Sequence, residues 1–221
     1  MKIIFIIIFS SLCYAGLIKP ENAQELNYIH VLFEWDQEPN TISYNLQVSD
    51  SPDFNNLIIN IQNPTTMYID NTNLNWNNLY YWRICPIYAN ETLGPWSSTS
   101  FFSIKESALT NSLQISINNH NLVQDGVIIY GQFLPDLLIG VIDNNGNEIW
   151  NAGLAEQEHE LGSLLNYVSD KGELYGKSQQ SGIKFNFDEN ILWETPDGVI
   201  MDLHEFQQLS NGNYIAFVPA Y

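Results

Sequence analysis

Basic residues are scarce in this chain. Lysine and arginine together number 7, against 25 aspartates and glutamates, and the formal net charge is −18. Nucleic acids and anionic membrane surfaces are held mainly by basic side chains, so this composition argues against both as partners. A negative charge of this size also keeps a protein in solution, and it needs no acidic function to explain it.

Cysteine and long apolar runs are rare as well. The apolar run at the N-terminus, Ile3–Phe9, has seven residues, whereas a membrane-spanning helix needs about 20. A basic residue before this run and the small Ala15 after it are typical of a cleavable signal peptide, which we place at residues 1–15. Its removal takes away Cys13 and leaves Cys85 alone, which excludes an internal disulfide. We therefore expect a periplasmic or secreted protein that does not insert into the membrane after the signal is removed.

The balance of residue types favours β structure. Aromatic residues make up 13% of the chain and charged residues only 14%, which is typical of sheets rather than of long solvated helices. Short apolar runs alternate with turn residues between residues 17 and 104. The strands expected there cover residues 29–35, 44–48, 57–61, 67–69, 80–84 and 98–104. Short strands at this spacing are typical of an immunoglobulin-like sandwich.

Two details of this segment resemble the fibronectin type III family. Leu74 precedes Tyr80 by six residues, the spacing of that family's tyrosine corner, in which the phenol bonds back to the chain. Trp35 takes the place of the core tryptophan on the second strand. The resemblance implies a fibronectin type III-like sandwich over residues 17–104, and its motifs concern packing rather than chemistry. Arg83 is accordingly expected to be an outward-facing strand residue and not a ligand contact.

The second half of the chain repeats two kinds of hairpin. Residues 105–112 are polar and lack periodicity, so we expect a linker there, followed by a second domain over residues 113–221. One kind of hairpin ends at Trp150 and again at Trp193, 43 residues later; the other kind recurs at a spacing of 40 residues. Two interleaved hairpins at this period indicate a four-stranded unit, the size of a β-propeller blade of about 40–45 residues.

The last of these hairpins begins in residues 202–213 and turns back into its second strand, residues 214–217. Asn211-Gly212 between apolar runs predicts a tight type I′ turn, in which both residues take a positive φ. His204 is then expected on a strand of this hairpin.

Isolated blades cannot bury both faces, so they stack around an axis and close into a ring. Residues 108–221 hold fewer than three such units, whereas propellers need at least about four. We therefore expect an all-β chain: an immunoglobulin-like (fibronectin type III) sandwich followed by an incomplete β-propeller of about two to three blades. Such a chain is expected to be the N-terminal part of a longer protein, or else to associate in order to close the ring.

The second domain resembles the start of the bacterial arylsulfate sulfotransferase family. The resemblance lies in residues 141–150, VIDNNGNEIW, and residues 204–213, HEFQQLSNGN. In that family, the second motif reads histidine, an acidic residue, an apolar residue, any two residues, Leu, any one residue and Asn-Gly-Asn. The resemblance implies a six-bladed propeller that catalyses transfer of a sulfuryl group from a phenolic sulfate donor to a phenol acceptor. The transfer passes through a sulfated histidine and needs no nucleotide donor or other cofactor.

His204 matches the motif histidine, and the resemblance places it in the active-site channel, not as the nucleophile. The nucleophile, and an arginine that neutralises the sulfuryl oxygens, would lie in later blades. No arginine follows Arg83, so this chain by itself is expected to be inactive. Judged from its neighbours alone, His204 beside Asp202 fits an oriented acid or base, and it fits a structural histidine equally well.

Three functions remain open: an exported sulfuryl transferase, an extracellular binding or adhesion protein with a non-catalytic propeller, and a surface scaffold. No metal site is expected. His159 lies among glutamates, but a single histidine in that setting is typical of a solvated loop. Residues 143–148 superficially suggest a calcium loop, yet Gly146 stands at the fourth position rather than the sixth, which favours a hairpin turn.

Overall fold

The computed structural model describes a large part of the chain, namely residues 16–108, 119, 122–132, 138–152, 163–178, 181–202 and 204–218. Regular structure in these residues is entirely β, with seventeen strands and no helix, so the expectation of an all-β chain is confirmed. No membrane-spanning helix is found among them. They form two compact units: residues 16–25 with His30–Ser103, and Leu26–Ile29 with the described residues from Ile104 onward.

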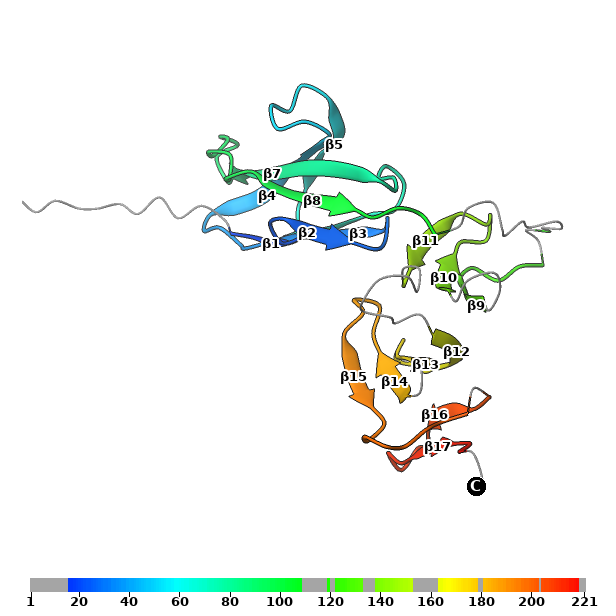
Figure 1. Cartoon of the computed structure of the whole chain (residues 1–221). Helices are drawn as coiled ribbons and strands as arrows, with labels where there is room; N and C mark the ends of the chain where they lie inside the picture. Colours follow the sequence, from blue (N-terminus) through cyan, green and yellow to red (C-terminus); the bar gives the residue numbers. More distant parts are fainter. Residues whose placement is uncertain are drawn as a thin grey trace, which may run out of the picture. The chain divides into compact units, whose positions relative to one another are not determined.

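The first unit is built from two sheets, with the strand orders β1-β3-β6 and β2-β8-β7-β4-β5 (Figure 1). Its strands are β1 (Leu17–Lys19), β2 (Gln24–Leu26), β3 (Val31–Trp35), β4 (Thr41–Ser49), β5 (Leu57–Asn63), β6 (Met67–Asp70), β7 (Asn78–Tyr88) and β8 (Ser100–Ile104).

Alternating side chains join these two sheets. Along β3, Val31, Phe33 and Trp35 are buried, while the residues between them are more exposed. The Phe33 ring lies edge-on to Trp82 of β7, with 5.3 Å between centroids, and to Phe102 of β8, at 5.8 Å. Because β3 belongs to one sheet and β7 and β8 to the other, these rings form a core between the sheets.

The phenol of Tyr80 bonds back to the chain, as the spacing predicts. The N–H of Asn75 donates to Tyr80 Oη over 3.0 Å, and Leu74 beside it is 3% exposed. This contact fixes the turn that leads into β7.

Tyr80→Phe is expected to lower the free energy of unfolding of the first unit by about 1 kcal/mol, because the Asn75 N–H loses its acceptor. Amide hydrogen exchange in β7 measures this loss without interference from the second unit. Tyr81→Phe, which alters the opposite face of β7, is the matched control. An equal loss in both variants would show that the hydroxyl of Tyr80 has no special role.

The second unit contains three sheets of antiparallel neighbours, with the orders β11-β10-β9, β12-β13-β14-β15 and β16-β17 (Figure 1). None of them closes on itself within the described ranges. The strands are β9 (Ile128–Gln132), β10 (Leu138–Ile142), β11 (Glu148–Asn151), β12 (Ser163–Val168), β13 (Leu174–Ser178), β14 (Ser181–Phe185), β15 (Ile191–Glu194), β16 (Phe206–Gln208) and β17 (Tyr214–Ala216).

Four turns of the second unit share one geometry. In each, the N–H of the first residue donates to the C=O of the fifth, and the N–H of the fourth donates to the C=O of the first. The fourth residue has a positive φ in every case. These turns are residues 143–147, 169–173, 186–190 and 209–213. A type I turn followed by a left-handed residue makes this hairpin loop, and the four hairpins expected from the sequence are confirmed.

The turn at Asn211-Gly212 is therefore not of type I′. Only Gly212 has a positive φ, 86°, and three residues separate Leu209 from Asn213. The side chain of Asn211 accepts the N–H of Asn213 over 3.0 Å. This Asx contact and the left-handed glycine together close a longer loop than the two-residue turn that was expected.

Residues 26–29 lie along the outer edge of β11. The N–H of Ile29 donates to the C=O of Ile149, and the N–H of Asn151 donates to the C=O of Asn27, each over 3.1 Å. A segment from the early part of the chain thus pairs with the first sheet of the second unit.

Candidate functional site

His204 lies in a bend two residues before β16. The expectation that it lies on the strand is wrong, because Asp202 caps the backbone there. Asp202 Oδ1 accepts the N–H of His204 over 3.0 Å. A side chain that binds the backbone two residues on makes an Asx turn, which keeps that N–H out of sheet pairing. Asp202 is in turn attached to the last hairpin, since its N–H donates to the C=O of Phe217 over 2.9 Å.

The same carboxylate orients the imidazole. Asp202 Oδ1 contacts His204 Nδ1, and this hydrogen bond lowers the pKa of Asp202. The positive charge of Lys177 lowers that pKa further. With Nδ1 held by Asp202, Nε2 is the ring atom that can meet a ligand. The His204 side chain is 80% exposed, so a ligand can reach it.

The charges around this imidazole are mainly negative. Glu205 follows His204 and is exposed, and Asp202 is on its other side. The arrangement can donate or accept a proton at Nε2, and the carboxylate of Asp202 can stabilise an imidazolium. It brings little positive charge to a bound anion.

Arg83 has a packing role in the first unit. Its guanidinium lies 3.8 Å from the centroid of the Phe54 ring and 4.3 Å from that of the Trp96 ring. It also donates two hydrogen bonds to Gln47 Oε1, over 3.0 and 2.8 Å. Stacking on two rings is a favourable use of a planar cation.

Two sequence features resemble metal sites: the turn that begins at Asp143, and His159 with its neighbouring glutamates. The turn from Asp143 to Asn147 is a hairpin turn in which Asp143 Oδ1 accepts the N–H groups of Asn145 and Asn147, each over 2.8 Å. His159 and the signal segment 1–15 lie outside the described residues. Within the described ranges, no group of three or more His, Cys, Asp or Glu side chains could hold a metal ion.

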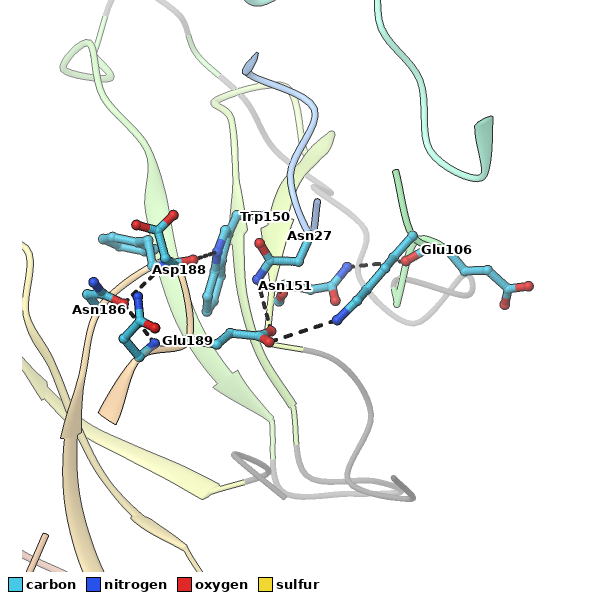
Figure 2. Close-up of polar contacts among 10 residues, drawn as sticks. Asn27, Glu106, Trp150, Asn151, Asn186, Asp188 and Glu189 are labelled. Atoms are coloured by element: carbon cyan, nitrogen blue, oxygen red, sulfur yellow. Dashed lines mark hydrogen bonds and ion pairs between the residues drawn. The ribbon is translucent and has the colours of Figure 1, made fainter. Parts of the chain in front are cut away.

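A second polar site, which the sequence does not predict, surrounds Asn27 in the second unit (Figure 2). Asn27 is 6% exposed, and its Nδ2 donates to the C=O of Asn151 and to Oε1 of Glu189, each over 2.9 Å. Lys105 Nζ lies 3.8 Å from Oε2 of Glu189. These contacts connect the segment of Asn27, the strand β11 and the turn between β14 and β15.

Glu189 has a left-handed backbone, with φ of 62°. It is the fourth residue of its turn, where the other three turns have Gly146, Gly172 and Gly212. A residue with a Cβ pays roughly 1–2 kcal/mol for this conformation. The hydrogen bond from Asn27 gives a physical reason for a glutamate at a position that favours glycine.

Trp150 connects the first two sheets of the second unit. It is 4% exposed, and its Nε1 donates to the C=O of Phe187 over 2.7 Å (Figure 2). The two rings also pack edge-on, with 5.1 Å between centroids. Trp193, its counterpart in the repeat, stacks on Tyr214 at 3.8 Å.

The two polar sites differ in what they can do. The groups around Asn27 bind one another, which is a structural arrangement. The Asp202–His204 pair is exposed and oriented, and it is the candidate for chemistry. No protein-family model matches this chain, and no curated protein matches it.

Proposed function

We propose that this chain is the N-terminal part of an exported arylsulfate sulfotransferase-like protein, in which a fibronectin type III-like sandwich precedes the first blades of a propeller. One observation carries the proposal: the oriented Asp202–His204 pair stands at the head of the hairpin whose sequence resembles the family's motif. Export is proposed on the signal-like segment, residues 1–15.

The arrangement of strands supports this architecture. Two facing sheets with a tyrosine bonded back to the chain suit a fibronectin type III sandwich. The antiparallel meander β12-β13-β14-β15 has the four strands of a blade. The hairpin β10–β11 has the same turn as β14–β15, and β16–β17 has the same turn as β12–β13. The sheets of the described residues do not close, so the proposed ring includes further blades.

The proposed reaction has two steps. A histidine of a later blade attacks the sulfur of an aryl sulfate; the N–S bond forms, the S–O bond to the ring breaks, and the phenolate leaves. An acceptor phenol then attacks the same sulfur; a new S–O bond forms, the N–S bond breaks and frees the histidine, and the phenol's proton passes through water to the phenolate released in the first step. In its protonated form His204 donates from Nε2 to a sulfuryl oxygen, while Asp202 stabilises the imidazolium through Nδ1.

A non-catalytic extracellular binding or adhesion protein is the second candidate, and the distribution of charge favours it. The single arginine of the sequence, Arg83, is engaged by two aromatic rings of the first unit. Two carboxylates flank His204. An anionic sulfuryl group in transfer needs positive charge around it, and the described part of this site supplies little.

His204→Ala, made in the protein expressed from its complete gene, is expected to slow sulfuryl transfer by about 100-fold or more, because it removes a donor to the sulfuryl oxygens. Asp202→Asn is expected to slow it less, since the imidazole remains but is less well oriented. Release of 4-nitrophenol from 4-nitrophenyl sulfate, with phenol as acceptor, measures the rate.

His30→Ala is the control, because His30 lies in the first unit, and it should keep the wild-type rate. An unchanged rate in His204→Ala would remove His204 from the active site. If the unaltered protein releases no phenol, the binding function is favoured instead.

A further inference from the structure

The hairpins β12–β13 and β16–β17 have the same turn but different neighbours. β13 has β14 along its outer edge, with Tyr175 opposite Lys184 and Gly176 opposite Ile183. Among the strands that the structure describes, β17 pairs with β16 alone. The other side of β17 is therefore a sheet edge whose backbone groups can pair with another strand.

Aligning the two turns shows which side chains differ in burial. Gly172 and Gly212 occupy the same turn position, so Ile215 corresponds to Tyr175. Tyr175 is 1% exposed, whereas Ile215 is 47% exposed and Phe217 is 60% exposed. A position that is buried in one hairpin is thus open in the other, and β17 and the residue that follows it present large apolar side chains.

Trp193 gives a second, independent indication. Trp150 and Trp193 each stand seven residues after the first residue of their turns, Asp143 and Asn186. Trp150 packs on Phe187, in the turn of β14–β15, and donates to its carbonyl. Trp193 holds the corresponding position in the next sheet, where it is only partly buried.

We infer that β17 and Trp193 together form a docking surface for a β-hairpin of the β14–β15 kind. Its first strand, apolar on one face, pairs antiparallel to β17, and its five-residue turn meets the indole of Trp193. One hairpin can make both contacts, because β14 pairs with β13 while the turn that follows it contacts Trp150. The inference rests on the modular architecture proposed above and not on the chemistry of His204.

The register of the last hairpin shows which backbone groups face this edge. Ile215 pairs with Gln207, and the C=O of Phe217 accepts a hydrogen bond from the side of β16. Because alternate residues of a strand point their N–H and C=O groups to opposite sides, those of Tyr214 and Ala216 face outward. Ala216→Pro therefore removes an outward N–H and spares the bonds to β16.

The test uses the whole chain and a peptide of residues 181–194, closed into a ring through an Asn-Gly turn so that the hairpin is already formed. Titration should saturate and should shift the NMR signals of the Tyr214 and Ala216 amides and of the Trp193 indole. Ala216→Pro should weaken binding at least tenfold. A control peptide in which Ile183 and Phe185 are both replaced by serine should bind at least tenfold more weakly.

Three results would overturn the inference: titration without saturation, equal binding by Ala216→Pro, or a dimer in sedimentation that Ala216→Pro disrupts. The last would mean that β17 pairs with a second copy of the chain and not with a hairpin. Aryl sulfate turnover is measured separately. Turnover is assayed in the protein expressed from the complete gene, and peptide binding in this chain. Turnover there with no peptide binding here overturns the docking surface alone, and peptide binding here with no turnover there overturns only the transferase.

Discussion

Replacement of Phe206 by alanine is expected to lower the stability of the last hairpin, β16–β17, by about 3–5 kcal/mol. Phe206 is 1% exposed, and the centroid of its ring lies 5.8 Å from that of Tyr175 and 5.6 Å from those of Trp193 and Tyr214. These rings belong to β13, β15 and β17, so Phe206 attaches the hairpin to the four-stranded sheet. Without it a cavity remains, which Met201, also buried there, fills only in part.

Amide hydrogen exchange of Gln207 and Ile215, which pair between the two strands, measures the opening of this hairpin. A single unfolding curve would mix two units and is less informative. Phe217→Ala is the matched control: it removes the same ring from a site that is 60% exposed, and it should change stability by no more than about 0.5 kcal/mol. Similar exchange in both variants would contradict the role given to Phe206.

Much of the second unit could be predicted because its signals are local. Asp143 and Ser169 each begin a turn whose fourth residue is a glycine, and the strands on either side are apolar. These local residues are enough to predict the hairpins. The spacing of Trp150 and Trp193 indicated the repeat, and both residues lie at contacts between sheets. The six-residue spacing of Leu74 and Tyr80 predicted that the phenol bonds back to the chain, and Tyr80 does accept the N–H of Asn75.

What could not be predicted depends on contacts that the apolar pattern does not show, most of them with residues far away in the sequence. The strand expected from residue 29 begins only at Val31, because Ile29 pairs with Ile149 instead. His204 was expected on a strand, since apolar alternation does not reveal that Asp202 will cap the backbone. The turn at Glu189 lacks its glycine, and nothing local in the sequence shows that a glutamate there meets a buried amide.

Glu189→Ala is expected to lower the stability of the second unit by about 2 kcal/mol, because it removes the charged acceptor of the buried amide of Asn27. Glu189→Gly should lose only about half as much, since glycine takes the left-handed backbone without the cost of a Cβ. Amide exchange of Ile29 and Asn151, whose N–H groups close the edge of β11, measures both changes.

Gly212→Glu is the matched control in the opposite direction. A Cβ at Gly212 meets no atom within 4 Å, so a glutamate there brings the backbone cost of about 1 kcal/mol with no partner to offset it. The same residue type should then stabilise one turn and destabilise another of the same geometry.

If Glu189→Gly instead raised the stability, strain at this turn would exceed the contact with Asn27. A double-mutant cycle with Asn27→Ala separates the two effects, because the backbone strain cancels in it, and a coupling energy near zero would mean that the contact contributes nothing. In that case residues 26–29 would be held on β11 mainly by their backbone hydrogen bonds.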